Sequence, residues 1–402
     1  MRKYSYMCLA ILFVFSFLVS CIPTSISNEP KTWQKTYGGT GFDGAQYIQQ
    51  TSDGGYIAVG WTDSFGSGGY DGYLLKLDGS GNLKWQKTFG GNQDDWFNYT
   101  RQTSDDGYIA VGWTYSYGQG LADVYVVKLD ANGELTWEET YGGDGFDEGY
   151  CIEQTADGGF VIVGESNSFV SGPVDVYVLK LDADGNLEWQ KTYRSDGSDG
   201  SDGSDEAFCI RKTSDGGYII AGRSDSQNTG MYDAYILKLD ANGELTWQNT
   251  YGGDDWDEAK SIYQTSDGGY IAVGVTNSLG AEWDAYAFKI APDGMLQWQH
   301  HFGGTGSDEA HDICQTMYGD YIVVGVTYSF GRGGDVYLLK LDESGNQKFS
   351  RNYGGNTFDE ANSIECTSDG RYIIAGRSDS FGTGCDDVYI LKINEDGNVD
   401  LM

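Results

Sequence analysis

An aromatic residue that opens a short segment ending in Tyr or Phe recurs along the chain. The successive spacings are 52, 52, 52, 58, 51 and 51 residues, at Trp33, Trp85, Trp137, Trp189, Trp247, Trp298 and Phe349. Seven near-equal units of this length are typical of a closed array in which each unit packs against its neighbours. This period constrains the fold more than the length of 402 residues does, because one repeat architecture accounts for almost the whole chain.

Each unit is predicted to contain four short strands. In the fifth unit they cover residues 245–251, 259–265, 270–276 and 285–290. Ser-Asp-Gly-Gly joins the second strand to the third, and Asp-Gly or Asn-Gly joins the fourth to the next unit's first; both are hairpin turns that need positive φ. The remaining connection, Gly-Gly followed by acidic residues, lacks a tight turn. It therefore predicts the crossing from one blade to the next.

This order of turns predicts an all-β fold, a seven-bladed β-propeller of four-stranded antiparallel blades. Each blade takes the second, third and fourth strands of one unit and the first strand of the following unit. The N-terminal strand near residues 33–37 then completes the last blade beside residues 388–393, which leaves no free sheet edge. A solenoid or two packed sandwiches are the alternatives.

The units resemble the short β-propeller repeats of secreted bacterial and archaeal proteins. The shared motifs are Tyr-Gly-Gly, Asp-Glu-Ala, Ser-Asp-Gly-Gly-Tyr-Ile, Asp-Val-Tyr and Lys-Leu-Asp, and they extend from Trp33 to the C-terminus. The resemblance implies the propeller fold and a surface location but no single activity. Two units depart from the pattern, with Gly44 and Trp96 where most units have Glu, and the fourth unit is lengthened.

The N-terminus has the three regions of a secretory signal. Arg2 and Lys3 precede an apolar run over residues 7–19, and the run ends in Leu-Val-Ser followed by Cys21. This ending resembles a bacterial lipobox, which implies cleavage before Cys21 and its acylation; an ordinary signal peptide is the alternative. We therefore expect a signal peptide at 1–20, a lipidated Cys and tether at 21–30, and the propeller at 31–402. The expected location is extracytoplasmic, lipid-anchored to the cell envelope.

The formal net charge of -35 comes from 60 acidic against 25 basic residues. Such a surface repels phosphate backbones, so we expect no nucleic-acid partner. The sequence has no nucleophile elbow, phosphate-binding loop or His-Glu-x-x-His motif. We therefore expect a protein that is not an enzyme and has no cofactor, apart from Ca²⁺ as a candidate.

Several polar positions recur in all seven units. An Asp stands at each crossing, a second Asp opens each fourth strand, and a Lys lies inside that strand, as at Asp257, Asp284 and Lys289. Because a catalytic site needs one asymmetric constellation, repetition favours turn capping and pairing between blades.

The lengthened fourth unit carries an iterated Ser-Asp-Gly segment over residues 195–206. Its carboxylates are hard oxygen ligands that suit Ca²⁺, and the candidate ligands are Asp199, Asp202, Asp205 and Glu206. A flexible repeat without metal is the simpler interpretation. His300, His301 and His311 are a weaker candidate for a transition metal.

Function is expected where the units differ. The crossings and the long loops should lie on one face of the ring and the tight turns on the other. On the crossing face, the first two units supply a candidate aromatic platform for a sugar or peptide, formed by Trp61, Tyr70, Trp96, Trp113, Tyr115 and Tyr117. Packing between adjacent blades is the alternative role for these rings.

The mature part has five cysteines after Cys21, too few and too scattered for a disulfide framework. Cys151 and Cys209 hold equivalent positions in neighbouring units, so a bridge between them is conceivable, although two buried thiols are expected.

The leading hypothesis is a non-catalytic binding or scaffold module for a carbohydrate, peptide or protein ligand. The runner-up is a polysaccharide hydrolase or lyase that uses loop carboxylates, and a purely structural spacer is the third option.

Overall fold

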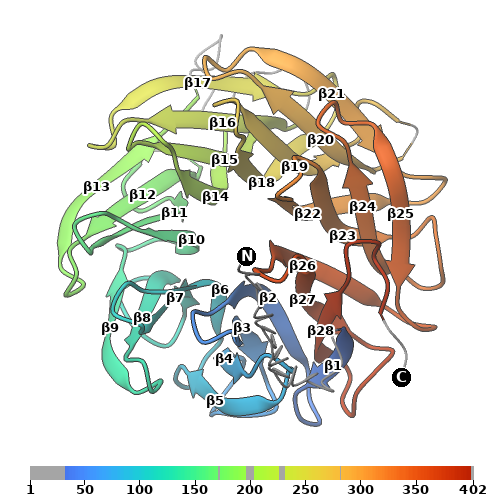
Figure 1. The fold of residues 1–402 in the computed structure, drawn as a ribbon. Helices are drawn as coiled ribbons and strands as arrows, with labels where there is room; N and C mark the ends of the chain where they lie inside the picture. The colour runs from blue at the N-terminus through green and yellow to red at the C-terminus, as the bar shows by residue number, and fades with distance from the viewer. Residues whose placement is uncertain (1–31, 171–172, 196–202, 226–230, 281, 400–402) are drawn as a thin grey trace, which may run out of the picture.

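The computed structural model describes residues 32–170, 173–195, 203–225, 231–280 and 282–399. These residues form seven four-stranded antiparallel sheets arranged as blades in a ring (Figure 1). All regular secondary structure in the described ranges is β, and no helix there has the length and apolar character needed to cross a membrane. The prediction of a seven-bladed propeller is confirmed.

Every blade uses its four strands in the same radial order. The innermost strands are β2 (Asp43–Gln50), β6 (Asp95–Gln102), β10 (Asp147–Gln154), β14 (Asp205–Lys212), β18 (Asp257–Gln264), β22 (Asp308–Gln315) and β26 (Asp359–Cys366). The second strands are β3 (Tyr56–Thr62), β7 (Tyr108–Thr114), β11 (Phe160–Ser166), β15 (Tyr218–Ser224), β19 (Tyr270–Thr276), β23 (Tyr321–Thr327) and β27 (Tyr372–Ser378). The third strands are β4 (Asp71–Leu77), β8 (Asp123–Leu129), β12 (Asp175–Leu181), β16 (Asp233–Leu239), β20 (Asp284–Ile290), β24 (Asp335–Leu341) and β28 (Asp387–Ile393). The outermost strands are β5 (Leu83–Phe89), β9 (Leu135–Tyr141), β13 (Leu187–Tyr193), β17 (Leu245–Tyr251), β21 (Leu296–Phe302), β25 (Gln347–Tyr353) and β1 (Trp33–Tyr37).

The first strand of the chain closes the ring. β1 pairs with β28 from Trp33 opposite Lys392 to Tyr37 opposite Val388, so the seventh blade contains both ends of the propeller. This closure covers an edge that would otherwise expose unpaired backbone groups. It confirms the predicted sharing of strands and excludes the solenoid and sandwich alternatives.

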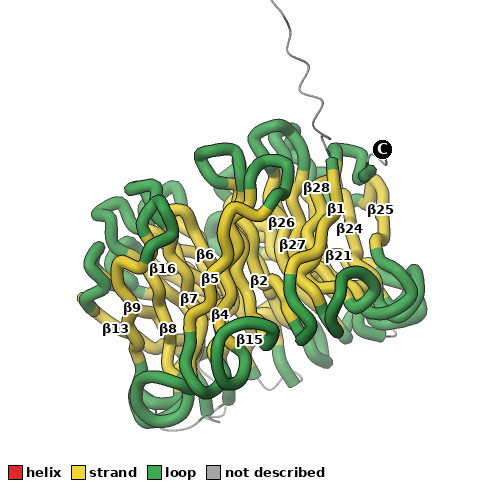
Figure 2. The backbone as a smooth tube through the Cα atoms, turned by 90° about the horizontal axis from the view of Figure 1, so that it is seen from below, coloured by secondary structure: helices red, strands yellow, loops and turns green. Residues whose placement is uncertain are grey.

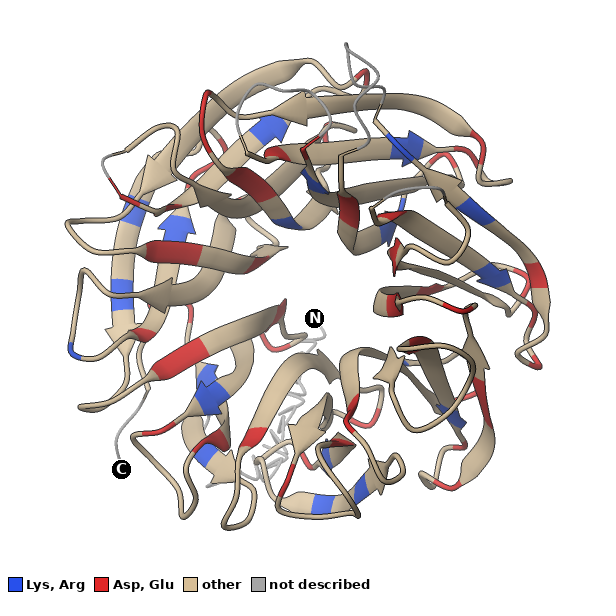
Figure 3. Ribbon diagram, turned by 180° about the vertical axis from the view of Figure 1, so that it is seen from behind, with Lys and Arg blue, Asp and Glu red and all other residues tan. Residues whose placement is uncertain are grey.

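The core lies between the blades. The second and third strands are buried almost throughout, as in β3 and β4, because neighbouring blades cover both faces of each sheet. The strands run between two faces covered by loops (Figure 2), and acidic residues occur around the whole ring (Figure 3). The crossings lie on one face with the long loops, here called the crossing face, and the tight turns lie on the other, the tight-turn face.

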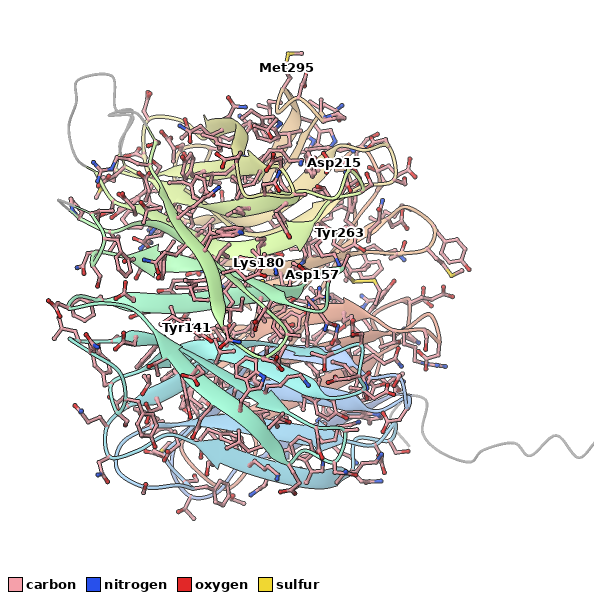
Figure 4. All side chains as sticks on the ribbon, turned by 90° about the vertical axis from the view of Figure 1, so that its left-hand side faces the viewer. Tyr141, Asp157, Lys180, Asp215, Tyr263 and Met295 are labelled. Carbon is pink, nitrogen blue, oxygen red and sulfur yellow. A yellow bond between two sulfur atoms is a disulfide. The ribbon has the colours of Figure 1, made fainter. Side chains whose placement is uncertain are left out.

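The repeated polar residues support this frame. Asp43 accepts hydrogen bonds from the Gly39 amide at 2.7 Å and from the Ser64 hydroxyl at 2.6 Å, which fixes a crossing against a loop. The buried lysine of each third strand lies beside the aspartate of the tight turn in its own blade, as Lys180 does with Asp157 (Figure 4). The seven pairs are Lys76–Asp53, Lys128–Asp105, Lys180–Asp157, Lys238–Asp215, Lys289–Asp267, Lys340–Asp320 and Lys392–Asp369. The predicted capping role is therefore confirmed, but the lysine pairs lie within blades and do not join them.

Each innermost strand has a β-bulge at its fourth residue. A bulge redirects side chains at the point where it interrupts the ladder. Here the bulged residues line a central cavity of about 160 Å³ between all seven innermost strands, with Gln46, Asn98, Tyr150, Phe208, Lys260, His311 and Asn362 in its wall. The axis of the ring is therefore a lined channel whose wall differs from blade to blade.

Candidate functional site

The strand register brings the most variable positions together at the crossing-face end of the channel. In each blade, the second residue of the innermost strand lies opposite the sixth residue of the next strand. We call these positions the inner rim; the pairs are Gly44–Trp61, Trp96–Trp113, Glu148–Glu165, Glu206–Arg223, Glu258–Val275, Glu309–Val326 and Glu360–Arg377. The rim repeats the same backbone with different side chains.

Blades one and two fill their part of the rim with stacked rings. The ring centroid of Trp96 lies 4.7 Å from that of Trp61 and 5.7 Å from that of Trp113. Tyr70 packs edge-on against Trp61 at 5.2 Å, and Tyr115 packs edge-on against Trp113 at 5.3 Å. We call these five residues the aromatic arc.

Packing inside the aromatic arc covers much of its surface. Trp61 is only 5% exposed, and a Cβ at Gly44 would lie 2.6 Å from the Trp61 ring. The absence of a side chain at Gly44 thus makes room for the indole. Trp61 is covered by its neighbours, whereas Trp96 and Trp113 are half-buried.

Tyr117 lies apart from the other predicted platform residues. Its hydroxyl donates to the Gly90 carbonyl oxygen at 2.6 Å, and its ring packs near Tyr125. The structure therefore brings together five of the six predicted ring residues and places Tyr117 in a contact that ties a loop to a crossing.

Blades four to six carry a chain of charged groups instead. Arg223 contacts Glu206 at 2.7 Å and Glu258 at 3.1 Å. Lys260 continues the chain to Glu258 at 3.4 Å and to Glu309 at 2.9 Å. His311 then contacts Glu309 at 3.1 Å. We call this set the charged arc: Glu206, Arg223, Glu258, Lys260, Glu309 and His311.

Two members of the charged arc are held in their ionised forms. Burial lowers the pKa of Lys260, but the charges of Glu258 and Glu309 outweigh it, so the pKa is raised. The hydrogen bond from His311 and, against the effect of burial, the charge of Lys260 lower the pKa of Glu309 below its usual range. Lys260 and Glu309 therefore present fixed charges.

A pocket of about 480 Å³ opens beside the charged arc on the crossing face. Its wall is formed by Arg223, Trp256, Glu258, Val275, Trp283, Ser307, Glu309 and Tyr328. The ring centroids of Trp256 and Trp283 are 5.7 Å apart, and the Arg223 guanidinium lies 5.1 Å from the Trp256 ring. We call it the rim pocket; it combines two half-buried indoles and the exposed ring of Tyr328 with charged groups that already have partners.

This pocket was not predicted from the sequence. Trp256 and Trp283 each directly precede a repeated aspartate, at Asp257 and Asp284. Tyr70 has the same position before Asp71 and was included in the platform. A comparison of the residue that precedes each repeated aspartate in the seven units would have found both indoles.

The third blade differs from all others because both of its rim positions are Glu. The Tyr150 hydroxyl lies 2.8 Å from a Glu148 carboxylate oxygen and 3.2 Å from one of Glu165. Burial, and then the charge of Glu206, raises the pKa of Glu165 to about 8, and burial also raises the pKa of Glu148. This pair therefore favours a protonated carboxyl at neutral pH.

The candidate calcium ligands divide into two groups. Asp199 and Asp202 lie outside the described residues. Asp205 accepts hydrogen bonds from the amide and hydroxyl of Ser195, both at 3.1 Å, and Glu206 pairs with Arg223. Among the described residues, no group of three His, Cys, Asp or Glu side chains is arranged to hold a metal ion.

The three histidines have separate partners. His300 packs on Trp298, His301 contacts Asp284 at 2.8 Å, and His311 belongs to the charged arc. They lie on two strands, β21 and β22. The structure thus places each one in a contact with a neighbouring ring or carboxylate.

Cys151 and Cys209 are free and buried, which confirms the expectation of two buried thiols. Cys314 and Cys366 form a disulfide that was not predicted, with a Cα–Cα distance of 6.0 Å, joining β22 to β26. They are the seventh and eighth residues of their strands, so equivalent repeat positions do not indicate this pair. Cys21, the proposed lipidation site, lies outside the described residues.

Comparison with known proteins relates the chain to propellers. A family described as "Domain of unknown function (DUF5122) beta-propeller" matches residues 155–188 and 367–401. These two segments of the chain are similar to that β-propeller repeat. The regulatory protein FlaEY of Caulobacter vibrioides is 26% identical over 184 residues, which cover 39% of this chain and 18% of that protein. The chain therefore spans less than a fifth of the length of this relative.

Solved structures show the same fold. The Pan2 WD40 domain of Neurospora crassa has a TM-score of 0.56 at 11% identity, with 90% of this chain and 96% of that chain covered. A puromycin hydrolase mutant has a TM-score of 0.53 at 12% identity, covering 92% and 55%. BBS1N, solved in complex with ARL6DN, has a TM-score of 0.52 at 9% identity, covering 92% and 98%. At this identity the likeness shows the propeller fold alone.

Proposed function

We propose that the protein is a non-catalytic binding module whose rim pocket takes a neutral carbohydrate. The observation that carries the proposal is the pairing of two indoles, Trp256 and Trp283, with fixed polar groups in one pocket of about 480 Å³. Aromatic faces stack on the apolar faces of sugar rings, and a few placed polar groups then orient the ligand. The net charge of -35 disfavours an anionic glycan.

The carboxylates of the rim pocket suit hydroxyl recognition. Glu258 and Glu309 are paired with Arg223 and Lys260, and the pKa of Glu309 is lowered by its His311 hydrogen bond and the Lys260 charge. An ionised carboxylate accepts hydrogen bonds from sugar hydroxyls but cannot act as a general acid. This arrangement supports binding over catalysis at the rim pocket.

The experiment combines a glycan array with titration of the full chain. The Trp256→Ala plus Trp283→Ala variant is expected to bind the selected glycan about 5-fold to 150-fold more weakly, from two lost contacts of about 0.5 to 1.5 kcal/mol each. Tyr318→Ala removes an exposed ring from the tight-turn face and serves as the matched control with unchanged affinity. A double variant that melts like the native chain and binds equally well would refute the rim pocket.

We also propose that the chain is exported and anchored by an acyl group on Cys21. Support comes from Arg2, Lys3, the apolar run over residues 7–19 and the Leu-Val-Ser-Cys ending. Labelling with a fatty acid in a bacterial host tests this: the native chain should take up label and Cys21→Ser should not. Equal labelling of both would contradict the anchor.

A second candidate is hydrolysis of a polysaccharide by the third blade. The observation that favours it is the Glu148–Tyr150–Glu165 contact together with the pKa of about 8 at Glu165, since a protonated carboxyl beside an ionised one is the pattern of a glycosidase. Reducing-sugar release from polysaccharides tests it. Release that Glu165→Gln abolishes, while Trp256→Ala plus Trp283→Ala does not, would favour this candidate over binding alone.

A further inference from the structure

The channel contains two thiols that the proposed binding function does not use. Cys151 on β10 and Cys209 on β14 hold the fifth position of two neighbouring innermost strands. They are 1% and 4% exposed, unbridged, and both lie in the wall of the central cavity of about 160 Å³. Two equivalent strand positions thus bring two reactive groups to one buried place.

The two sulfur atoms contact each other in unlike environments. The interaction with Cys151 and, against the effect of burial, the charge of Arg211 lower the pKa of the Cys209 thiol. Burial raises the pKa of Cys151. Arg211 also donates to the Cys151 sulfur at 3.3 Å. One sulfur is therefore poised as a thiolate and the other as its proton donor.

The groups around the pair come from every packed strand. Tyr47 on β2 stacks with Tyr99 on β6, and the Arg211 guanidinium lies 5.3 Å from the Tyr99 ring. Arg101 on β6 is paired with Glu153 at 2.6 Å. On the other side of the thiol pair, the Ser261 hydroxyl on β18 lies 4.0 Å from the Cys209 sulfur. The buried carboxylate of Asp312 on β22 lies on this side as well.

The same ring already contains one bridge between innermost strands. The Cys314–Cys366 disulfide joins β22 to β26 across a Cα–Cα distance of 6.0 Å, within the range of ordinary disulfides. β10 and β14 are neighbours in the ring as β22 and β26 are. The fold therefore accommodates a bridge between neighbouring innermost strands, although Cys151 and Cys209 both hold the fifth strand position and Cys314 and Cys366 hold the seventh and eighth.

A second cavity lies beside the pair, toward the tight-turn face. A cavity of about 310 Å³ is lined by Arg101, Glu153, Arg211, Lys212, Tyr263 and Gln264. Arg211 lines both this cavity and the central one. The guanidinium that contacts Cys151 thus lies between the outer cavity and the thiols.

We propose that Cys151 and Cys209 are a redox-active dithiol that a low-molecular-weight disulfide oxidises to an inter-blade bridge. The Cys209 thiolate attacks one sulfur of the small disulfide, forms a mixed disulfide and releases one thiolate. Cys151, after losing its proton to that thiolate, attacks the Cys209 sulfur and releases the second. The two protein thiols are oxidised, one small disulfide is reduced to two thiols, and charge and protons balance.

The test treats the full chain with hydroxyethyl disulfide at pH 7 and maps its peptides by mass spectrometry. The native chain should yield joined peptides containing Cys151 and Cys209. Cys151→Ser should retain the mixed disulfide on Cys209, and Cys209→Ser should react at Cys151 at least about tenfold more slowly, because so little thiolate is present. The exposed Cys385 reports that the reagent is active.

Two results would overturn the proposal. One is the absence of joined peptides after both hydroxyethyl disulfide and hydrogen peroxide, a smaller oxidant that enters narrower cavities, in samples where Cys385 has reacted. The other is faster reaction at Cys151 in Cys209→Ser than at Cys209 in Cys151→Ser, with both variants melting as cooperatively as the native chain. Either result leaves the pair as two buried apolar thiols.

Discussion

The aromatic arc and the charged arc occupy the same rim positions of one repeated scaffold, yet they leave different surfaces. In blades one and two, Trp61 lies under its neighbours and the rings fill the space between the blades. In blades four to six, Arg223 and Lys260 connect carboxylates across the blades, and the rim pocket stays open beside them. Stacked rings close a rim, whereas ion pairs fix its groups without filling it.

Residues that maintain the repeated fold can also be distinguished from residues that vary between the blades. Residues that fix the strands recur in every blade, such as Asp43 at a crossing and Lys180 beside Asp157. The rim residues are not part of that repeated frame, and they differ from blade to blade. The two arcs are therefore two uses of positions that the scaffold leaves free.

The largest expected effect comes from breaking the charged arc at its centre. Arg223→Met should lower the free energy of unfolding by about 3 to 5 kcal/mol, because it leaves the buried Glu206 carboxylate without its partner and removes one of the two partners of Glu258. Both Glu206 and Glu258 are 7% exposed. Urea unfolding monitored by tryptophan fluorescence measures this change.

Arg377→Met is the matched control for this prediction. Arg377 holds the same rim position in blade seven, but its partners Glu360 and Asp386 have more exposed side chains, so a smaller loss is expected. Equal losses in the two variants would show that burial of the carboxylates does not set the stability of the charged arc.

A pH titration tests the third blade, which lies between the two arcs. Because the folded pKa of Glu165 is about 8, above its ordinary value of about 4.3, the folded state keeps a proton that the unfolded state releases between these pH values. The free energy of unfolding should therefore fall as pH rises from about 5 to 8, by an amount on the order of a few kcal/mol. Glu165→Gln should reduce this fall, and the buried Glu365, whose pKa burial raises to about 7, should account for part of what remains.

Glu309→Gln is the opposite case in the charged arc. The pKa of Glu309 is lowered, so its contribution to stability is present above the ordinary pKa and is lost only as the solution becomes more acidic. Between pH 5 and 8 this variant should keep the slope of the native chain. A native slope that survives Glu165→Gln would assign the pH dependence to other groups.

Most of the fold could be predicted from the sequence because the same strand and turn motifs recur in all seven units. The predicted strand at 270–276 agrees with β19, and closure by β1 is confirmed. The predicted second strand of the same unit began two residues late, because β18 starts at Asp257. Hairpin turns are visible as Gly-containing motifs, whereas the start of a strand after a crossing has no such marker.

The candidate site was harder to predict because it depends on contacts between blades. A β-bulge at the fourth residue of each innermost strand turns Lys260 and His311 toward the channel. No residue type in the sequence predicts a bulge at this position. The rim pocket likewise joins Trp256, Trp283 and Tyr328 from separate loops. Variable positions could be identified from the sequence, but not which of them line the same pocket.

The smallest expected effect compares one indole of the rim pocket with one of the aromatic arc in glycan binding, and it rests on the proposed function. Trp283→Ala in the rim pocket should weaken a glycan selected on an array by about 2-fold to 10-fold, the value of one stacked contact of about 0.5 to 1.5 kcal/mol. Trp113→Ala should change affinity by less than about twofold, because Trp113 packs between Trp96 and Tyr115. Calorimetric titration of both folded variants with the same glycan measures the difference. A larger loss in Trp113→Ala would move the ligand to the aromatic arc, as the sequence first suggested, and would make the charged arc a structural element.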